Sequence, residues 1–295
     1  MNEKKILILG GSSFVGRHMF KFLGTARAIA THKNNPVKGS VYFDSLTMDL
    51  PQILDAPNEI SNAVILLGDT KPDSCYLDAR KSQALNVDSI KTILEQLKEF
   101  KIKPVFASSH FVFDGVRGGY TEADRPNPIL KYAEQKVEVE EFIHQTFSDY
   151  LILRLAQVYG LERGDGTVFN NWLDDIEAGK TIYCAEDYIS CPIFVGDVAA
   201  GITGLIDVNA NGIFHMGSHE PLSRMELYQE LADQLNGSAP KNSRAVSCSI
   251  HDFNMVEKRP ENISMVVDKL VNRIGIQLKD VRSACREISE LSQIT

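Results

Sequence analysis

The sequence is poor in cysteine, contains no long hydrophobic run and has no cluster of basic residues. Its five cysteines are scattered, odd in number and never spaced as CxxC, which favours reduced thiols over disulfides or a metal site. The apolar part of MNEKKILILGG is too short for a signal peptide, and no apolar run could span a membrane, so we predict a cytoplasmic protein. A net charge of -8 argues against a nucleic-acid partner.

The sequence does contain a regular alternation of short apolar runs and helical patterns. The runs ILIL, AVILL and LILRLA do not alternate in polarity, as expected for strands covered by helices on both faces. Strands that alternate with helices predict parallel pairing through right-handed crossovers. We therefore predict an α/β fold, a Rossmann-type doubly wound parallel sheet with a smaller mixed α/β part. Residues 1–160 are predicted to bind a dinucleotide and 161–295 mostly a substrate, with segments around 187–217 returning to the Rossmann domain.

A glycine-rich turn, GGSSFVG, follows the first predicted strand and opens the first helix. Glycine at such a turn lets the backbone approach a pyrophosphate, and the free amides of the helix start supply donors. The middle position is serine, whose Cβ reduces close approach, and a plain tight turn is the alternative reading. The predicted cofactor contacts here are Gly10, Ser12, Ser13, Phe14 and Val15.

The second predicted strand, ARAIATH, is not followed by an acidic residue that could accept hydrogen bonds from the 2'-hydroxyl of NAD. His32 and Lys33 stand there instead, and a cation attracts a 2'-phosphate. The sequence therefore favours NADP(H) over NAD(H). The alternative is a solvated loop that is indifferent to the phosphate.

A hydroxyl, a phenol and an amine are placed where they could act on one oxygen atom. The strand KPVFASS ends in Ser108 and Ser109, at the edge of the sheet where a cofactor would lie. Tyr132 and Lys136 are four apart in a helical pattern and so share one face. A nearby ammonium should lower the pKa of the phenol, which could then exchange a proton with a carbonyl or alcohol oxygen. Together these groups predict hydride transfer between nicotinamide and a ketone.

The glycine turn, the serine strand and YAEQK, in this order, resemble the extended short-chain dehydrogenase/reductases. More specifically, SSHFVFDGVRGGYTEADRPNPILKYAEQK is similar to the signature region of the dTDP-4-dehydrorhamnose reductase family, and the similarity continues to RPENISMVVDKLVNRIGI. The resemblance implies that Ser109 is the catalytic hydroxyl residue and Tyr132 the general acid. It also implies that Lys136 binds the nicotinamide ribose and depresses the pKa of the tyrosine.

The resemblance implies further contacts. Asp49 and Leu50 resemble the family's pair beside the adenine, and Asn86 matches the asparagine of its active-site helix, although a turn residue and a helix cap are the alternatives. Other expected cofactor contacts are Leu67 and Gly68. The expected substrate contacts are Ser109, His110, Phe111, Asn170 and Trp172, while Arg154 is predicted to be a buried structural arginine.

The sequence departs from the family in LLGDTKPDSC after the fourth strand and in DYISCPIFVGD. Cofactor chemistry is therefore better supported than the identity of the sugar. We predict NAD(P)H-dependent reduction of a keto group on a nucleotide-linked deoxysugar, by a protein compatible with a homodimer. The alternatives are a nucleotide-sugar epimerase or dehydratase that retains NAD, and a non-catalytic NADP-binding regulatory subunit.

Overall fold

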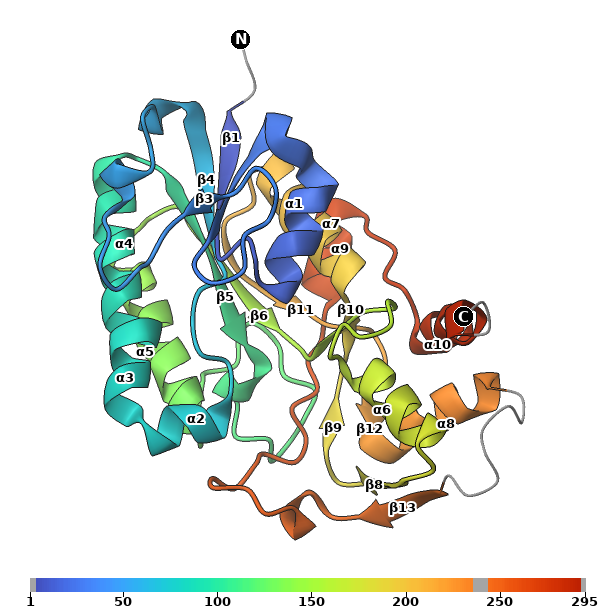
Figure 1. The fold of residues 1–295 in the computed structure, drawn as a ribbon. Coiled ribbons are helices and arrows are strands. Elements are labelled where there is room, and N and C mark those ends of the chain that lie inside the picture. Colours follow the sequence, from blue (N-terminus) through green and yellow to red (C-terminus); the bar gives the residue numbers. More distant parts are fainter. Residues whose placement is uncertain (1–3, 236–243, 293–295) are drawn as a thin grey trace.

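The computed structural model describes residues 4–235 and 244–292. A seven-stranded parallel sheet lies at the centre of the larger part (Figure 1). Its strands, in spatial order, are β11 (Gly212–Met216), β6 (Leu151–Leu155), β5 (Lys103–Ser109), β4 (Ile60–Ile65), β1 (Lys5–Leu9), β2 (Ala28–His32) and β3 (Val41–Tyr42). The chain winds outward from β1 in one direction and from β4 in the other, so the predicted doubly wound α/β fold is confirmed.

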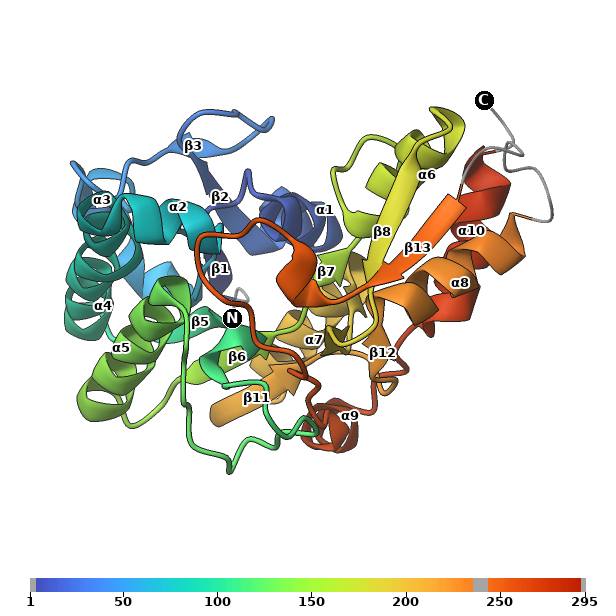
Figure 2. The same cartoon turned by 90° about the horizontal axis from the view of Figure 1, so that it is seen from below.

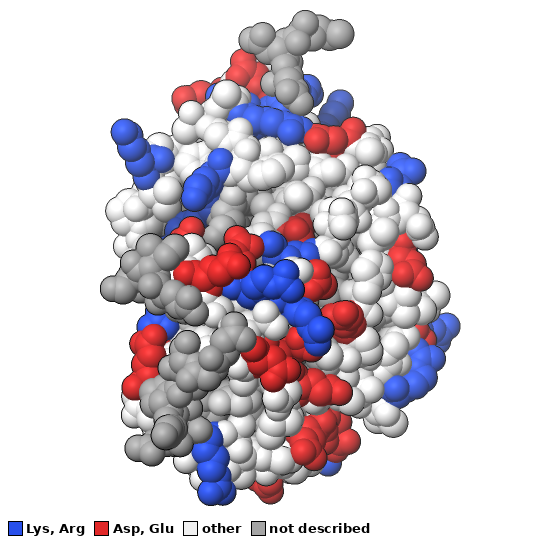
Figure 3. Space-filling model, turned by 90° about the vertical axis from the view of Figure 1, so that its right-hand side faces the viewer, with Lys and Arg blue, Asp and Glu red and all other residues white. Residues whose placement is uncertain are grey.

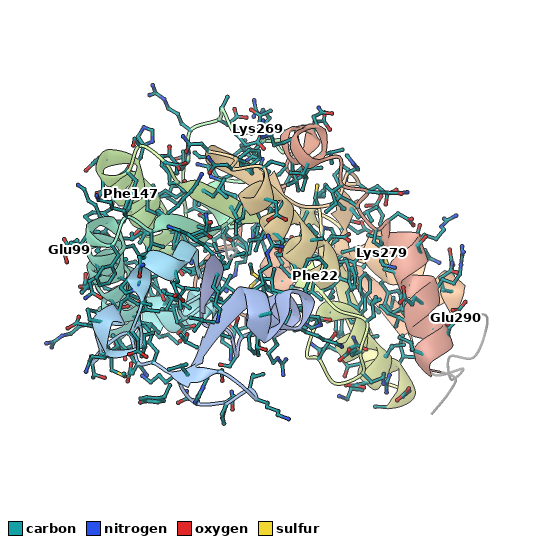
Figure 4. All side chains as sticks on the ribbon, turned by 90° about the horizontal axis from the view of Figure 1, so that it is seen from above. Phe22, Glu99, Phe147, Lys269, Lys279 and Glu290 are labelled. Atoms are coloured by element: carbon teal, nitrogen blue, oxygen red, sulfur yellow. The ribbon has the colours of Figure 1, made fainter. Side chains whose placement is uncertain are left out.

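Helices cover both faces of this sheet. One face carries α1 (Phe14–Arg27), α7 (Val195–Asp207) and α9 (Asp268–Ile274), and the other carries α2 (Pro72–Leu77), α3 (Ala79–Gln83), α4 (Ser89–Glu99) and α5 (Lys131–Thr146). Seen from above, Phe22 on α1 lies on the side of the sheet opposite to Glu99, the last residue of α4, and Phe147, which follows α5 (Figure 4).

The sheet has one apolar core on each face. Ile6 and Ile8 of β1 pack toward α1 and α7, whereas Leu7 and Leu9 pack toward α4 and α5. Successive side chains of a strand point to opposite faces, so a continuous apolar run is what a doubly covered strand requires. This packing fixes the carboxyl ends of β1, β4, β5 and β6 at one edge of the sheet.

The smaller part lies beyond that edge. Its elements are α6 (Val168–Glu177), α8 (Arg224–Gln234), α10 (Val281–Ser292) and short strands β7 (Val158–Tyr159), β8 (Thr181–Ala185), β9 (Ile189–Ser190), β10 (Ile193–Phe194), β12 (Leu222–Ser223) and β13 (Arg244–Cys248). Its own core contains Trp172, Leu227 and Ile288. The functional division of the chain at residue 160 stays a prediction.

On the face that Figure 3 presents, acidic and basic side chains are interspersed. Within 4–235 and 244–292, no helix has the length and apolarity to cross a bilayer.

Candidate active site

The glycine turn is packed too closely for a side chain at any of its three glycines, Gly10, Gly11 and Gly16. Gly10 has a φ of +86°, which glycine adopts without strain, and a Cβ added at Gly16 would lie 2.3 Å from the carbonyl oxygen of Gly10. Ser13 is the N-cap of α1, because its hydroxyl accepts a hydrogen bond from the amide of Gly16 at 3.1 Å. The amides of Phe14 and Val15 then begin the helix, which is the arrangement that holds a dinucleotide phosphate.

The three predicted catalytic residues come together. Ser109 ends β5, and Tyr132 and Lys136 lie one turn apart on α5. The hydroxyl of Ser109 is hydrogen-bonded to Tyr132. The ammonium of Lys136 donates a hydrogen bond to the carbonyl oxygen of Ala107 at 2.9 Å and lies 5.7 Å from the centre of the Tyr132 ring. These contacts hold the hydroxyl, the phenol and the amine next to one another. We call the group of Ser109, Tyr132 and Lys136 the catalytic wall.

The electrostatics of the phenol differ from the expectation. Burial raises the pKa of Tyr132 above its usual value, and the hydrogen bond from Ser109 only partly opposes this effect. Desolvation dominates the pKa of the phenol in this structure, and the lowering of this pKa by Lys136 stays a prediction. Burial also lowers the pKa of Lys136 to about 8. The phenol consequently carries its proton at neutral pH and is able to donate it.

A stability measurement can test the desolvation of Lys136. Below pH 8 the lysine is charged in both the folded and the unfolded chain, so its burial cost is fully present. Between about 8 and 10.5 only the folded chain loses the proton, and above 10.5 the cost vanishes. Wild type should therefore gain up to about 3 kcal/mol of unfolding free energy over Lys136→Met across this window. A difference between the two proteins that stays constant in denaturant titrations from pH 7 to 10.5 refutes a desolvated lysine.

Behind the catalytic wall lies a buried ion pair. Arg154 of β6 donates hydrogen bonds to both carboxylate oxygens of Glu140, at 2.7 and 3.2 Å, and the hydroxyl of Ser108 donates to the same carboxylate. As predicted, Arg154 is buried and structural. Because Ser108 is committed to this pair, Ser109 is the serine left to hydrogen-bond Tyr132.

A cavity of about 670 Å³ follows the carboxyl ends of β1, β4, β5 and β6. Its lining combines the start of α1 with the catalytic wall. The predicted site residues that line it are Ser13, Phe14, Val15, Leu67, Ser109, His110, Phe111, Tyr132 and Lys136. A doubly wound sheet binds its ligands at such a switch point, and the start of α1 at one end of the cavity fits the phosphates of a nicotinamide dinucleotide.

Other predicted cofactor residues shape this edge without lining the cavity. Asn86 is buried; its amide oxygen accepts from the Asp69 amide at 2.7 Å, and its amide nitrogen donates to the Asp69 carbonyl and to Gln135. A Cβ at Gly68 would lie 2.8 Å from the same Asn86 oxygen. The backbone amide of Gly10 donates a hydrogen bond to the Thr31 hydroxyl of β2, and the amide of Ser12 donates to the Thr31 carbonyl oxygen. Asn86 thus fixes the loop that presents Leu67.

Asp49 and Leu50 also lie outside the cavity lining. The Asp49 carboxylate accepts from the Gln96 side-chain amide at 2.6 Å, and the Leu50 amide donates to Gln96 at 2.7 Å. Leu50 is fully buried in the core under α4. The observed contacts are therefore structural, and direct contact of this pair with a cofactor stays a prediction.

The cations after β2 already have partners. Lys33 forms an ion pair with Asp44 at 2.8 Å, and the His32 ring is hydrogen-bonded to the Ser40 hydroxyl at 2.7 Å. Asp44 follows β3, so an acidic side chain does lie near the end of β2, although it comes from the next strand and not from β2 itself. A 2'-phosphate would have to compete with this carboxylate for Lys33.

A second cavity, of about 630 Å³, adjoins the first. Trp172 lines it together with Asn171, whereas the predicted substrate residue Asn170 lines neither cavity. Asn170 is buried, and both polar atoms of its amide lack a partner among the described residues. Trp172 therefore reaches the second cavity and Asn170 reaches neither, and a substrate contact by either residue stays a prediction.

A segment after β13 crosses from the smaller part to the Rossmann helices (Figure 2). Phe253 and Met255 line the second cavity. Farther along, Glu257 accepts from the amide of Lys131 at the start of α5, and Arg259 forms an ion pair with Asp73 of α2 at 2.6 Å. This segment thus joins one wall of the second cavity to α2 and α5.

Arg224 and Tyr188 are among the cavity residues that the sequence did not predict. Arg224 and Tyr188 line the first cavity, and Arg224 also lines the second. The sequence SRME does contain a signal that could have singled out Arg224. Ser223 and Glu226 form a capping box, which marks the start of α8 and shows that Arg224 lies in its first turn. A cation at this position interacts unfavourably with the positive end of the helix dipole, so Arg224 does not serve to stabilise the helix.

The sequence model of a protein family described as RmlD substrate binding domain matches residues 4–293. The probable low-salt glycan biosynthesis reductase Agl14 of Haloferax volcanii is 25% identical over 82% of this chain and 85% of that protein. Methionine adenosyltransferase 2 subunit beta of Bos taurus is 26% identical over 56% of this chain, which covers 52% of that protein.

A solved structure shares the fold. The dTDP-4-dehydrorhamnose reductase of Bacillus anthracis, in complex with NADP, matches with a TM-score of 0.80 and 18% identity, over 97% of this chain and 98% of that chain. The similarity extends through both the sheet and the smaller part.

Proposed function

This chain belongs to the RmlD substrate binding domain family, of the extended short-chain dehydrogenase/reductase type, and we propose that it is an NAD(P)-dependent reductase of a keto group on a nucleotide-linked deoxysugar. The observation that carries the proposal is the wall of Ser109, Tyr132 and Lys136 beside the glycine turn. We further propose that residues 1–160 hold the cofactor and that 161–295 mostly hold the substrate.

Each residue of the wall has a role in the proposed reaction. The bound nicotinamide supplies the hydride. The Ser109 hydroxyl hydrogen-bonds the keto oxygen, and Tyr132, which burial keeps protonated, donates its proton to that oxygen as negative charge develops. Lys136, held by the Ala107 carbonyl, orients the ribose and stabilises the phenolate that remains.

We propose NADP(H) as the favoured cofactor, on the basis of His32 and Lys33. Wild type should then use NADPH better than NADH, and a His32→Gln, Lys33→Met double variant should lose about one to two powers of ten of that preference, mainly through the KM for NADPH. Asp44→Asn is the matched variant, because it frees Lys33 and should increase the preference. Steady-state kinetics with both cofactors, at low and high salt, measure the effect. Unchanged preference in all variants refutes the assignment.

The substrate is found by screening dTDP-, UDP-, GDP- and CDP-linked 4-keto sugars while NADPH absorbance is followed. A keto-sugar that accelerates NADPH oxidation supports the proposal and also identifies the base. If every sugar leaves NADPH unchanged, the proposed substrate class is wrong.

Two alternatives remain distinguishable. A nucleotide-sugar epimerase or dehydratase retains its NAD and converts its substrate without net oxidation of added cofactor. A regulatory subunit, the alternative that the similarity to methionine adenosyltransferase 2 subunit beta raises, would bind NADP and reduce no sugar. Only the proposed reductase consumes NADPH.

A further inference from the structure

Arg224 is a cation without a carboxylate partner. Among residues 4–235 and 244–292, no ion pair or side-chain hydrogen bond involves Arg224, and its Nη1 atom is shielded from solvent without a partner. The guanidinium lies 5.2 Å from the ring centre of Tyr188 and 6.0 Å from that of Trp172. These rings hold the group in place but do not neutralise it.

An unpaired charge in such surroundings is costly. Shielding a guanidinium nitrogen from water without a hydrogen bond costs free energy, and the position in the first turn of α8 adds unfavourable interaction with the helix dipole. Nearby, burial and the charge of Arg224 lower the pKa of His110 to about 3, so His110 stays neutral and offers no compensation. A ligand that brings negative charge would remove the cost.

The position of Arg224 indicates which part of a ligand it meets. Arg224 lines both cavities, as do Phe14 and Gln157, so it lies where the two cavities join. The first cavity contains the catalytic wall, and the second contains Trp172, Phe253 and other aromatic surface. A ligand that spans the junction would place its reacting group beside Tyr132 and its far end beside Trp172.

We infer that Arg224 binds the diphosphate that joins the sugar of the substrate to its nucleoside, with the sugar in the first cavity and the nucleoside in the second. This inference rests on the proposed function, because it takes the sugar to react at Tyr132. A guanidinium offers paired donors that match two phosphate oxygens, and hydrogen bonds to charged groups are the strong ones. Arg224 is then a specificity residue that separates nucleotide-linked sugars from free sugars.

Calorimetric titration of dTDP, thymidine and inorganic pyrophosphate tests the inference. The titrations are made with and without saturating NADP⁺, which fills the other phosphate site at the glycine turn. Arg224→Met removes the charge, Arg224→Lys keeps it without the fork, and Arg282→Met is the matched control, because Arg282 is an exposed arginine paired with Glu230. Trp172 is the only tryptophan of the chain, so its fluorescence reports pyrophosphate binding next to Arg224 independently of activity.

Arg224→Met should weaken dTDP binding about 10- to 100-fold and abolish the fluorescence change with pyrophosphate. Thymidine and NADP⁺ affinities should stay within about twofold, Arg224→Lys should be intermediate, and Arg282→Met should match wild type. Equal dTDP affinity in Arg224→Met and wild type overturns the inference, as does a wild type that binds neither dTDP nor pyrophosphate.

The two proposals fail in different ways. If dTDP binding depends on Arg224 but no keto-sugar is reduced, the phosphate site stands and the proposed reaction is wrong. If a keto-sugar is reduced with the same KM by wild type and Arg224→Met, the reaction stands and the role of Arg224 is overturned.

Discussion

Replacing Tyr132 with Phe should lower turnover by roughly two to four powers of ten, the usual contribution of a general acid. The substitution keeps the ring, which packs against Phe111 with centroids 6.4 Å apart, and removes only the hydroxyl that Ser109 holds. Turnover with the substrate from the keto-sugar screen measures the effect. NADPH affinity should barely change, because the hydroxyl acts on the keto oxygen in the proposed reaction.

The matched control is Tyr150→Phe. That phenol lies outside both cavities and is hydrogen-bonded to the His144 ring at 2.7 Å, so its loss should leave turnover near the wild-type value. Wild-type turnover in Tyr132→Phe would remove Tyr132 from the reaction. Loss of NADPH binding together with turnover would show that the ring has a packing role instead.

The second large effect concerns stability. Arg154→Leu should lower the free energy of unfolding by about 3 to 5 kcal/mol, because it leaves the buried Glu140 carboxylate with Ser108 as its remaining side-chain partner. Denaturant titration at neutral pH measures the loss. A change of less than about 1 kcal/mol would show that the pair is far more hydrated than its burial indicates.

A double variant separates the ion pair from packing. Replacing both Glu140 and Arg154 with Met removes the two charges together and fills similar volume, and such exchanges are often neutral. We therefore expect the double variant to regain much of the stability that Arg154→Leu loses. Equal destabilisation of both variants would assign the loss to packing around Phe113, which Arg154 covers at 5.2 Å.

The sequence predicted the central sheet because the local signals agreed. Apolar runs without alternation, each followed by a helical pattern, are compatible with few arrangements, and the observed strand order is one of them. The smaller part was only outlined. Its strands of two residues, such as β9 and β12, depend on long-range pairing that leaves little periodicity in the sequence.

The catalytic wall was predictable because its residues lie in one continuous segment with helical spacing. Its electrostatics were not, since the burial that raises the pKa of Tyr132 depends on neighbours from several elements. The same limit applies to Lys33, whose partner Asp44 comes from beyond β3, and to Arg224, which reaches the cavities from α8. Direct contacts of Asp49 and Asn86 with a cofactor stay predictions.

The stoichiometry of NADPH oxidation to sugar product is the most direct test of the proposed reductase. With a nucleotide-linked 4-keto sugar, quantified product and oxidised cofactor should rise together in a one-to-one ratio, and both should stop when either reactant is exhausted. Product that accumulates without net NADPH oxidation would contradict the account in favour of an epimerase or dehydratase. Tight cofactor binding without any product would contradict it in favour of a regulatory subunit.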